Sequence, residues 1–170
     1  MRTDSNEGLC QEAIEAYLSR LDVDPASVGA PTRSLLARLQ HAHLTTVPFE
    51  TLAITGDLYG EREGAGVMLA GAHLYEKIVA QRRGGYCFEL NGLFHTLLDA
   101  LGYTVHRAAA RMASAPRIPA NHHTNIVTLD RRYVVDVGTG PPAVRVPVPL
   151  DGPPKTDGVG VEWRAASSER

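Results

Sequence analysis

Hydrophobic residues in the first half of the chain recur every three or four positions, the spacing that places them on one face of an α-helix. This pattern covers residues 14–21, 35–43 and 74–79, and closely spaced glycines interrupt it between 56 and 66. The clearest example runs over 88–101, where Gly102 follows as a typical C-terminal stop. The spacing predicts a helical first half whose last and strongest helix begins near Cys87.

After Gly102 the pattern changes to stretches that are rich in β-branched residues. We expect strands at 103–112, 124–129 and 133–137, with the last two forming a hairpin through the short connection at 130–132. Six of the eleven prolines follow Gly138, and proline disfavours both a helix and a central strand. The chain is therefore expected to be α+β, with a helical half that leads into a small antiparallel sheet.

Charge and composition exclude several classes of protein. Seventeen Lys and Arg residues against nineteen Asp and Glu residues leave a net charge of −2, so the basic excess typical of nucleic-acid binders is absent. The longest apolar run covers 65–72, far short of the roughly 20 residues needed to span a bilayer. The polar N-terminus does not resemble a secretory signal, and two cysteines cannot form a disulfide framework. We therefore expect a cytoplasmic protein with free thiols and with neither nucleic acid nor membrane as a partner.

Cys87 is the strongest candidate for a nucleophile. A thiol at the start of a helix lies near the positive end of the helix dipole and near unpaired N–H groups, which favour the thiolate. Gly84 and Gly85 precede it and leave room for a substrate carbonyl to approach. A buried structural cysteine is the alternative interpretation, and it is the one we adopt for Cys10, which lies in an amphipathic helix.

A thiolate nucleophile needs a base and a group that orients the base. His122 and His123 open a predicted strand, and Asp136 lies in the strand expected to pair with it, which suggests a Cys-His-Asp triad. The alternatives are surface histidines and an aspartate in a turn. The remaining candidate histidines are expected to be structural: His41, His43 and His95.

A metal site is the main competing use of one cysteine and two histidines. Neighbouring residues of a strand point to opposite faces, so His122 and His123 cannot readily bind one metal ion together with Cys87. The sequence also has no second cysteine at a spacing of two to four residues. We therefore expect no metal.

Four ordered segments between residues 9 and 150 resemble motifs of the arylamine N-acetyltransferase family. Residues 83–91, RGGYCFELN, fit its RGGxCxExN nucleophile motif, and 46–52, TVPFETL, are similar to its VPFENL segment. Residues 77–79 match its KIV, and 133–140, YVVDVGTG, resemble its YLVDVGFG aspartate motif.

The resemblance implies a core arranged as in cysteine proteases, and three parts: a helical bundle, an antiparallel β-barrel and an α/β lid. We expect 1–86 to form the N-terminal helical bundle and 87–150 to form the nucleophile helix and a portion of the β-barrel or sheet. Residues 151–170 are expected to be a poorly anchored tail or the start of the third domain, with the chain truncated before the lid.

The same resemblance implies roles for the residues of the site. Cys87 would accept the acyl group, and Asp136 would orient the histidine. His122 fits the family's H-x-x-x-x-V pattern because Val127 follows five residues later, whereas His123 does not. His123 stays a second candidate, because the hairpin connection is one residue shorter than in the family and a register shift would exchange the two faces.

Two further residues are expected to bind substrate, again from the resemblance. Phe49 belongs to the VPFE segment, and Thr139 stands where the family usually has phenylalanine. We expect the smaller threonine to make the acceptor pocket wider and more polar.

The activity that the resemblance implies is a ping-pong transfer of an acetyl group from acetyl-CoA, through a cysteine thioester, to an arylamine or arylhydrazine. Acetyl-CoA would be a co-substrate, with no permanently bound cofactor. Two alternatives remain open: an amide synthase of a polyketide pathway, and a truncated inactive homologue that acts as a scaffold. Apolar surface exposed where a lid would lie also suggests a homo-oligomer.

Overall fold

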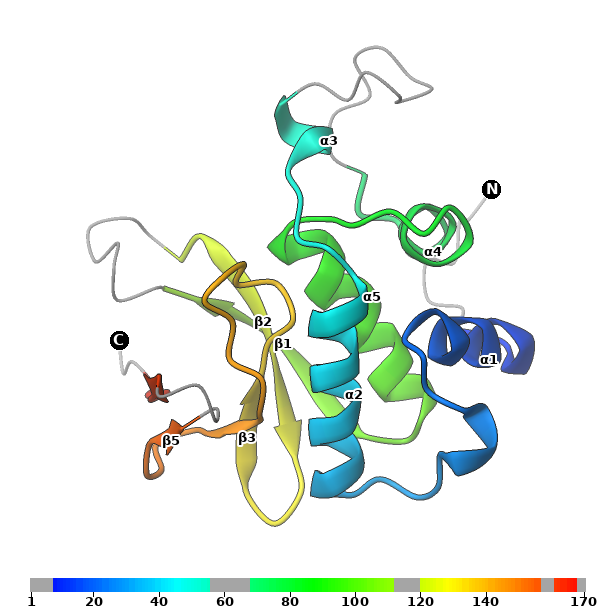
Figure 1. Ribbon diagram of the computed structural model, residues 1–170. Helices are drawn as coiled ribbons and strands as arrows, with labels where there is room; N and C mark the ends of the chain where they lie inside the picture. Colours follow the sequence, from blue (N-terminus) through cyan, green and yellow to red (C-terminus); the bar gives the residue numbers. More distant parts are fainter. Residues whose placement is uncertain (1–7, 56–67, 112–119, 157–160, 168–170) are drawn as a thin grey trace, which may run out of the picture.

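The computed structural model describes residues 8–55, 68–111, 120–156 and 161–167. Three long helices dominate its first half (Figure 1): α1 (Gln11–Arg20), α2 (Arg33–Thr46) and α5 (Cys87–Ala100). Shorter elements are α3 (Leu52–Thr55), α4 (Gly71–Tyr75), the 3-10 turn η1 (Pro25–Ser27) and the π-helical turn η2 (Glu76–Ala80). The expected helical half is confirmed.

The ends of the two longest helices are fixed by local hydrogen bonds. At α2 the Thr32 side chain accepts from the Leu35 N–H at 3.1 Å, an N-cap that satisfies one of the free donors of the first turn. At α5 the Glu89 carboxylate accepts from the Tyr86 N–H at 3.1 Å, as in a capping box. The start of α5 is therefore held firmly, although glycines precede it.

The second half of the chain forms an antiparallel sheet of four strands in the order β1-β2-β3-β4. Its strands are β1 (Thr104–Ala110), β2 (His122–Thr128), β3 (Arg132–Val135) and β4 (Val148–Pro149). The expected β2–β3 hairpin is confirmed, with Val127 opposite Tyr133. The proline-rich segment contributes only the short edge strand β4, where a missing N–H is tolerated.

The last part of the described chain forms a second, two-stranded sheet of β5 (Lys155–Thr156) and β6 (Glu162–Trp163). Leu150 bridges to Ala165, and Asp151 accepts hydrogen bonds from Ser167 at 2.7 Å. The expected division of the chain at residues 86 and 150 stays a prediction.

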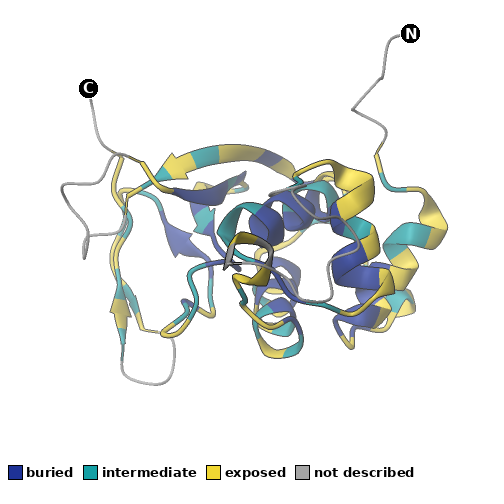
Figure 2. Ribbon diagram, turned by 90° about the horizontal axis from the view of Figure 1, so that it is seen from above, coloured by how far each residue is buried: buried dark blue, intermediate teal, exposed yellow. Residues whose placement is uncertain are grey.

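Helix α5 lies between the sheet and the other helices. Toward α2, the Phe94 ring of α5 meets the His43 ring with centroids 5.2 Å apart. Toward the sheet, the Asn125 side chain of β2 donates to the Asn91 carbonyl at 3.0 Å. Figure 2 shows the buried residues concentrated where these layers meet. The buried apolar residues of α5, Leu90, Leu93, Phe94, Leu97 and Leu98, recur at helical spacing along the side that packs into the core.

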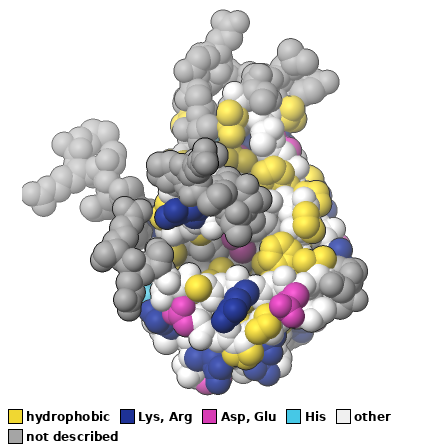
Figure 3. Space-filling view, turned by 90° about the vertical axis from the view of Figure 1, so that its left-hand side faces the viewer, with side chains coloured by type: hydrophobic (Ala, Val, Ile, Leu, Met, Phe, Trp, Pro, Cys, Tyr) yellow, Lys and Arg dark blue, Asp and Glu magenta, His cyan; other side chains and the backbone are white. Residues whose placement is uncertain are grey.

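The surface is mixed in character. On the face shown in Figure 3, basic, acidic and hydrophobic side chains of the described residues lie interspersed. Within the described ranges, no helix is both long enough and apolar enough to cross a membrane.

Candidate active site

Cys87 is the first residue of α5, and the turn before it is held against the segment 48–50. The Gly85 N–H donates to the Pro48 carbonyl at 3.3 Å, and the Glu50 N–H donates to the Gly85 carbonyl at 2.9 Å. A Cβ atom on Gly84 would lie 2.0 Å from the Pro48 carbonyl oxygen, so only glycine fits there. The two family-like segments therefore form one unit that presents the half-buried Cys87 at a helix N-terminus.

His122 connects the thiol to a carboxylate. Its Nε2 lies 2.5 Å from Asp136 Oδ2, and its side chain is also hydrogen-bonded to Cys87. With Nε2 occupied, Nδ1 is the ring nitrogen left for the thiol. Burial lowers the pKa of His122, but the hydrogen bonds to Asp136 and Cys87, together with their negative charge, raise it to about 9. The imidazole is therefore protonated at neutral pH.

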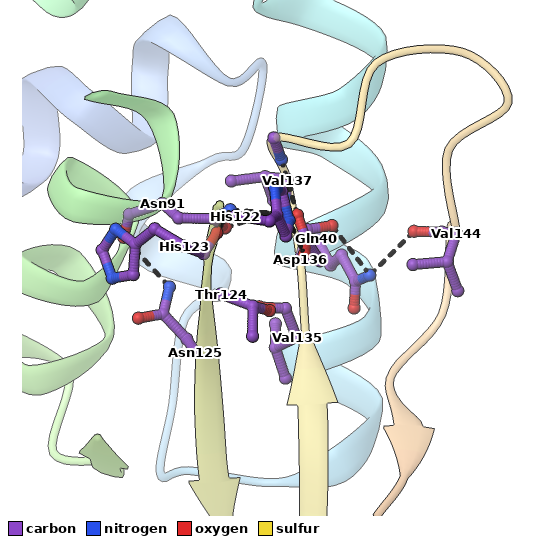
Figure 4. Close-up of polar contacts among 11 residues, drawn as sticks. Gln40, Asn91, His122, His123, Thr124, Asn125, Val135, Asp136, Val137 and Val144 are labelled. Carbon is purple, nitrogen blue, oxygen red and sulfur yellow. Dashed lines mark hydrogen bonds and ion pairs between the residues drawn. The ribbon is translucent and has the colours of Figure 1, made fainter. Parts of the chain in front are cut away.

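Asp136 is buried directly after β3 and is held by several donors (Figure 4). Its Oδ1 accepts from Asn91 Nδ2 and from the Gly138 N–H, each at 2.9 Å, while Oδ2 faces His122. Burial raises the pKa of this carboxyl, yet the bonds to His122, Asn91 and Gly138 hold it below its ordinary value. Asp136 is therefore a charged, fixed partner for the imidazolium.

Asn91 is a site residue that the sequence reasoning did not single out. Fully buried on α5, it donates to the His123 carbonyl at 2.6 Å and to Asp136, and its Oδ1 accepts from the Val137 N–H at 3.0 Å. It therefore ties the start of β2 to the end of β3. Its spacing of four residues from Cys87 on one helix was a usable signal, since such residues share a face.

Gln40 on α2 is a second residue that the sequence did not reveal. Its Nε2 donates to the Val144 carbonyl at 2.8 Å and to the Asp136 carbonyl at 3.2 Å, as Figure 4 shows. Both contacts join residues about a hundred positions apart, so no local sequence pattern predicts them.

A buried cluster of charges lies next to the nucleophile turn. Lys77 Nζ contacts both carboxylate oxygens of Glu89 at 2.8 and 2.9 Å and lies 3.3 Å from Glu50, which Arg83 also approaches to 3.5 Å. Glu89 is the residue that caps α5 through Tyr86. Removing one partner of such a buried pair is costly, because the other charge is left without compensation.

Of the two expected substrate residues, Phe49 lines a groove of about 300 Å³ next to the nucleophile turn, and Thr139 does not. Phe49, 42% exposed, lines it together with Gly140. Gly140 has φ of +66°, and a Cβ atom there would lie 3.5 Å from the Phe49 ring. Thr139 lies between Gly138 and Gly140. A Cβ atom on Gly138 would lie 2.6 Å from Cys87 Cα. That Phe49 and Thr139 contact substrate stays a prediction.

The other histidines occupy different places. His123 points away from Asp136 and packs its ring against Phe88, with centroids 5.8 Å apart. His43 is fully buried, and its Nε2 forms a hydrogen bond of 3.0 Å with the Tyr17 hydroxyl. Burial lowers the pKa of His43 to about 3. Across the ranges that the structure describes, no group of three or more His, Cys, Asp or Glu side chains is arranged to hold a metal ion.

Comparison with known proteins gives consistent results. A family model described as N-acetyltransferase matches residues 34–170. Arylamine N-acetyltransferase / N-hydroxyarylamine O-acetyltransferase of Salmonella typhimurium is 37% identical over 143 residues, 81% of this chain and 47% of that protein. Proansamycin X synthase of Amycolatopsis mediterranei is 32% identical over 161 residues, 92% of this chain and 59% of that protein.

The fold agrees with a solved structure. Mycobacterium marinum arylamine N-acetyltransferase in complex with CoA superposes with a TM-score of 0.65 and 33% identity, over 79% of this chain and 49% of that chain. The chain spans about half the length of the curated relatives it matches. The matched motifs, the fold and the family model agree, and the chain belongs to the arylamine N-acetyltransferase family.

Proposed function

We propose that this chain carries an acyl-transfer centre in which Cys87 accepts an acetyl group from acetyl-CoA and passes it to the nitrogen of an arylamine or arylhydrazine. The observation that carries this proposal is the position of His122, hydrogen-bonded on one side to Cys87 and on the other to a buried, charged Asp136. A base held between a thiol and a carboxylate is the arrangement that activates a cysteine nucleophile.

In the first half-reaction the Cys87 sulfur attacks the thioester carbonyl of the donor. The tetrahedral intermediate collapses with cleavage of the bond to the CoA sulfur, and the His122 imidazolium donates its proton to the departing thiolate. An acetyl-cysteine and free CoA result. Asp136, bonded to His122, keeps the ring oriented while its charge changes.

In the second half-reaction the neutral His122 accepts a proton from the amine as its nitrogen attacks the acetyl-cysteine carbonyl. Collapse of this intermediate releases the amide and returns the thiolate–imidazolium pair. The N–H groups of Cys87 and Phe88 precede the first backbone bonds of α5, which run from Glu89 and Leu90 to the Tyr86 carbonyl, so they are suited to stabilise the oxyanion, at about 3 kcal/mol per donor.

The choice of donor and acceptor rests on the comparisons. The Mycobacterium marinum relative was solved with CoA, and the Salmonella typhimurium relative is named for arylamine N-acetylation. The groove beside Phe49 offers an aromatic wall against which an aryl ring could stack.

A second candidate is amide synthesis from a bulky, carrier-bound acyl chain. The match to Proansamycin X synthase, 32% identical over 92% of this chain, is the observation that supports this candidate. Thr139, smaller than the phenylalanine usual in the family, would accommodate a larger acyl group. The same triad would serve both reactions.

The test is intact-mass measurement of the folded protein after mixing with acetyl-CoA or p-nitrophenyl acetate. We expect one acetyl group on the chain and on Cys10→Ser, none on Cys87→Ser, and loss of the group when an arylamine is added. Acylation by a polyketide thioester but not by acetyl-CoA would favour the amide synthase. No acylation of folded protein by any donor would overturn the proposal and favour an inactive scaffold.

A further inference from the structure

A second pocket lies beside the direct sequence neighbours of the catalytic candidates. Phe88 follows Cys87, and His123 follows His122, but both side chains face away from the triad. They line an open pocket of about 230 Å³ together with Leu69, Leu74, Gly92 and Arg107. No member of the Cys87–His122–Asp136 triad lines it, so it is a separate site.

One end of this pocket is polar and positively charged. Arg107 of β1 pairs with Asn125 of β2, two residues along from His123, so Arg107 and His123 share a face of the sheet. Within the described part of the chain, no acidic side chain forms an ion pair with Arg107. Burial and the charge of Arg107 both lower the pKa of His123 and of His95.

His123 lines the pocket and has an unsatisfied ring nitrogen. The residue is only 9% exposed, one ring nitrogen is hydrogen-bonded to the Phe88 backbone, and the buried Nε2 has no partner among the described residues. A buried polar atom without a partner is unfavourable, so its retention points to a ligand that completes its hydrogen bonding. The aromatic ring of Phe88 holds the imidazole in this orientation.

The rest of the pocket is apolar. Leu74 is buried, Leu69 is half-exposed, and both line the pocket together with Phe88. A guanidinium favours a planar anion such as a carboxylate and repels cations. Hydrocarbon walls favour a ligand whose anionic group is attached to an apolar body.

We propose that this pocket binds a small carboxylate with an apolar body, its carboxylate between Arg107 and His123 and its body against Leu69, Leu74 and Phe88. The site does not depend on the acyl transfer proposed above.

Binding should be linked to uptake of a proton. Burial and Arg107 lower the pKa of His123, with His122 acting in the same direction and Asp136 opposing it, while His95 faces the same cluster. Free His123 is therefore neutral at pH 7, with Nε2 as an acceptor. A carboxylate placed beside Nε2 favours the imidazolium, which can donate to it, so affinity should rise as the pH falls from 8 to 6.

Titration calorimetry of the folded chain with benzoate tests the proposal. We expect saturable binding to one site, about tenfold weaker in Arg107→Met and in His123→Leu. Arg131→Met is the matched control, since it removes one positive charge at the exposed hairpin, where Arg131 lies 3.6 Å from Asp130, and it should bind as the unmodified chain does. Benzamide, without the charge, should bind at least tenfold more weakly, and inorganic phosphate, without the apolar body, should not compete.

Several results would overturn the proposal. These are the absence of saturable benzoate binding, equal affinity for benzamide, effective competition by phosphate, or an unchanged affinity in Arg107→Met. Weaker binding in Phe49→Ala would place the ligand in the groove beside the nucleophile instead. Thermal unfolding of each variant checks its fold, and if His123→Leu does not fold, Arg107→Met decides, because Arg107 is exposed on β1.

Discussion

Asn91 donates a hydrogen bond of 2.9 Å to Asp136, a residue 45 positions away in the chain, and so joins the nucleophile helix to the strand that carries the carboxylate. The same amide nitrogen donates to the His123 carbonyl, next to His122. The three elements that supply Cys87, His122 and Asp136 therefore meet at one buried side chain. Asn91 therefore helps to fix their relative geometry.

Asn91→Ala should consequently disturb the whole site. It leaves Asp136 Oδ1 with one donor fewer and the Val137 N–H without its partner. We expect a loss of about 1–3 kcal/mol in the free energy of unfolding, measured with urea. We also expect at least tenfold slower acylation with a shifted pH profile, whereas the exposed Asn121→Ala should change neither. An unchanged pH profile in Asn91→Ala would leave it only a structural role.

The two cysteines should differ in reactivity. Cys87 is at a helix N-terminus and hydrogen-bonded to His122. Cys10 is exposed at the N-cap of α1, so the expectation that it is a buried structural cysteine was wrong. Iodoacetamide should alkylate Cys87 at least about tenfold faster at pH 6–7, as read by peptide mass spectrometry. Equal rates for the two thiols over this pH range would contradict the triad.

Replacing each histidine separately distinguishes the two neighbours. His122→Ala should reduce acyl-enzyme formation by about 10²–10⁴-fold, because it removes the group that transfers the proton. His123→Ala should retain most of this activity, since its ring faces Phe88. Single-turnover acylation by p-nitrophenyl acetate is the measurement, and the opposite result would assign the base to His123.

Gly138 should tolerate no side chain. A Cβ atom there would lie 2.6 Å from Cys87 Cα and 2.9 Å from Asn91 Nδ2, so Gly138→Ala must displace the nucleophile. We expect a loss of about 1–3 kcal/mol in stability and slower acylation. Gly71→Ala, where a Cβ atom meets nothing within 4 Å, is the control. Wild-type acylation in Gly138→Ala would show that Cys87 does not need this packing.

Stability should depend on pH through His122. Its pKa is about 9 in the folded protein, against 6.5 for an unperturbed histidine, so folding favours the protonated form. This contribution is fully present below pH 6.5 and is lost as the pH rises through 9. From pH 6 to pH 9.5, the free energy of unfolding measured with urea should decrease more for the unmodified chain than for His122→Asn. Equal decreases would contradict the raised pKa.

Much of this architecture could be predicted because it rests on local patterns. The spacing of apolar residues located α5, and Gly102 marked its end, since both effects operate within a few residues. The β2–β3 hairpin followed from the short connection at 130–132. Alternation along β2 also implied that His122 and His123 point to opposite faces, which the structure shows.

The parts that could not be predicted depend on contacts between distant segments. Gln40 reaches the Asp136 and Val144 carbonyls across the fold, and a polar residue on a helix gives no sign of such a target. Burial of Lys77 and Glu89 was equally hidden, because charged residues are usually placed on the surface. Periodicity describes one element at a time, whereas these side chains are fixed by two or three.

The buried pairing of Lys77 with Glu89 has a consequence for how this protein can diverge. Either charge alone is unfavourable in that environment, so neutralising one creates pressure to neutralise the other. Neutral amides at both positions could still hydrogen-bond to each other and to the Tyr86 N–H, whereas neutralising Lys77 alone would leave the buried Glu89 carboxylate without its cation. Among related sequences, positions 77 and 89 should therefore covary: both should be charged or both neutral, while Cys87 stays constant.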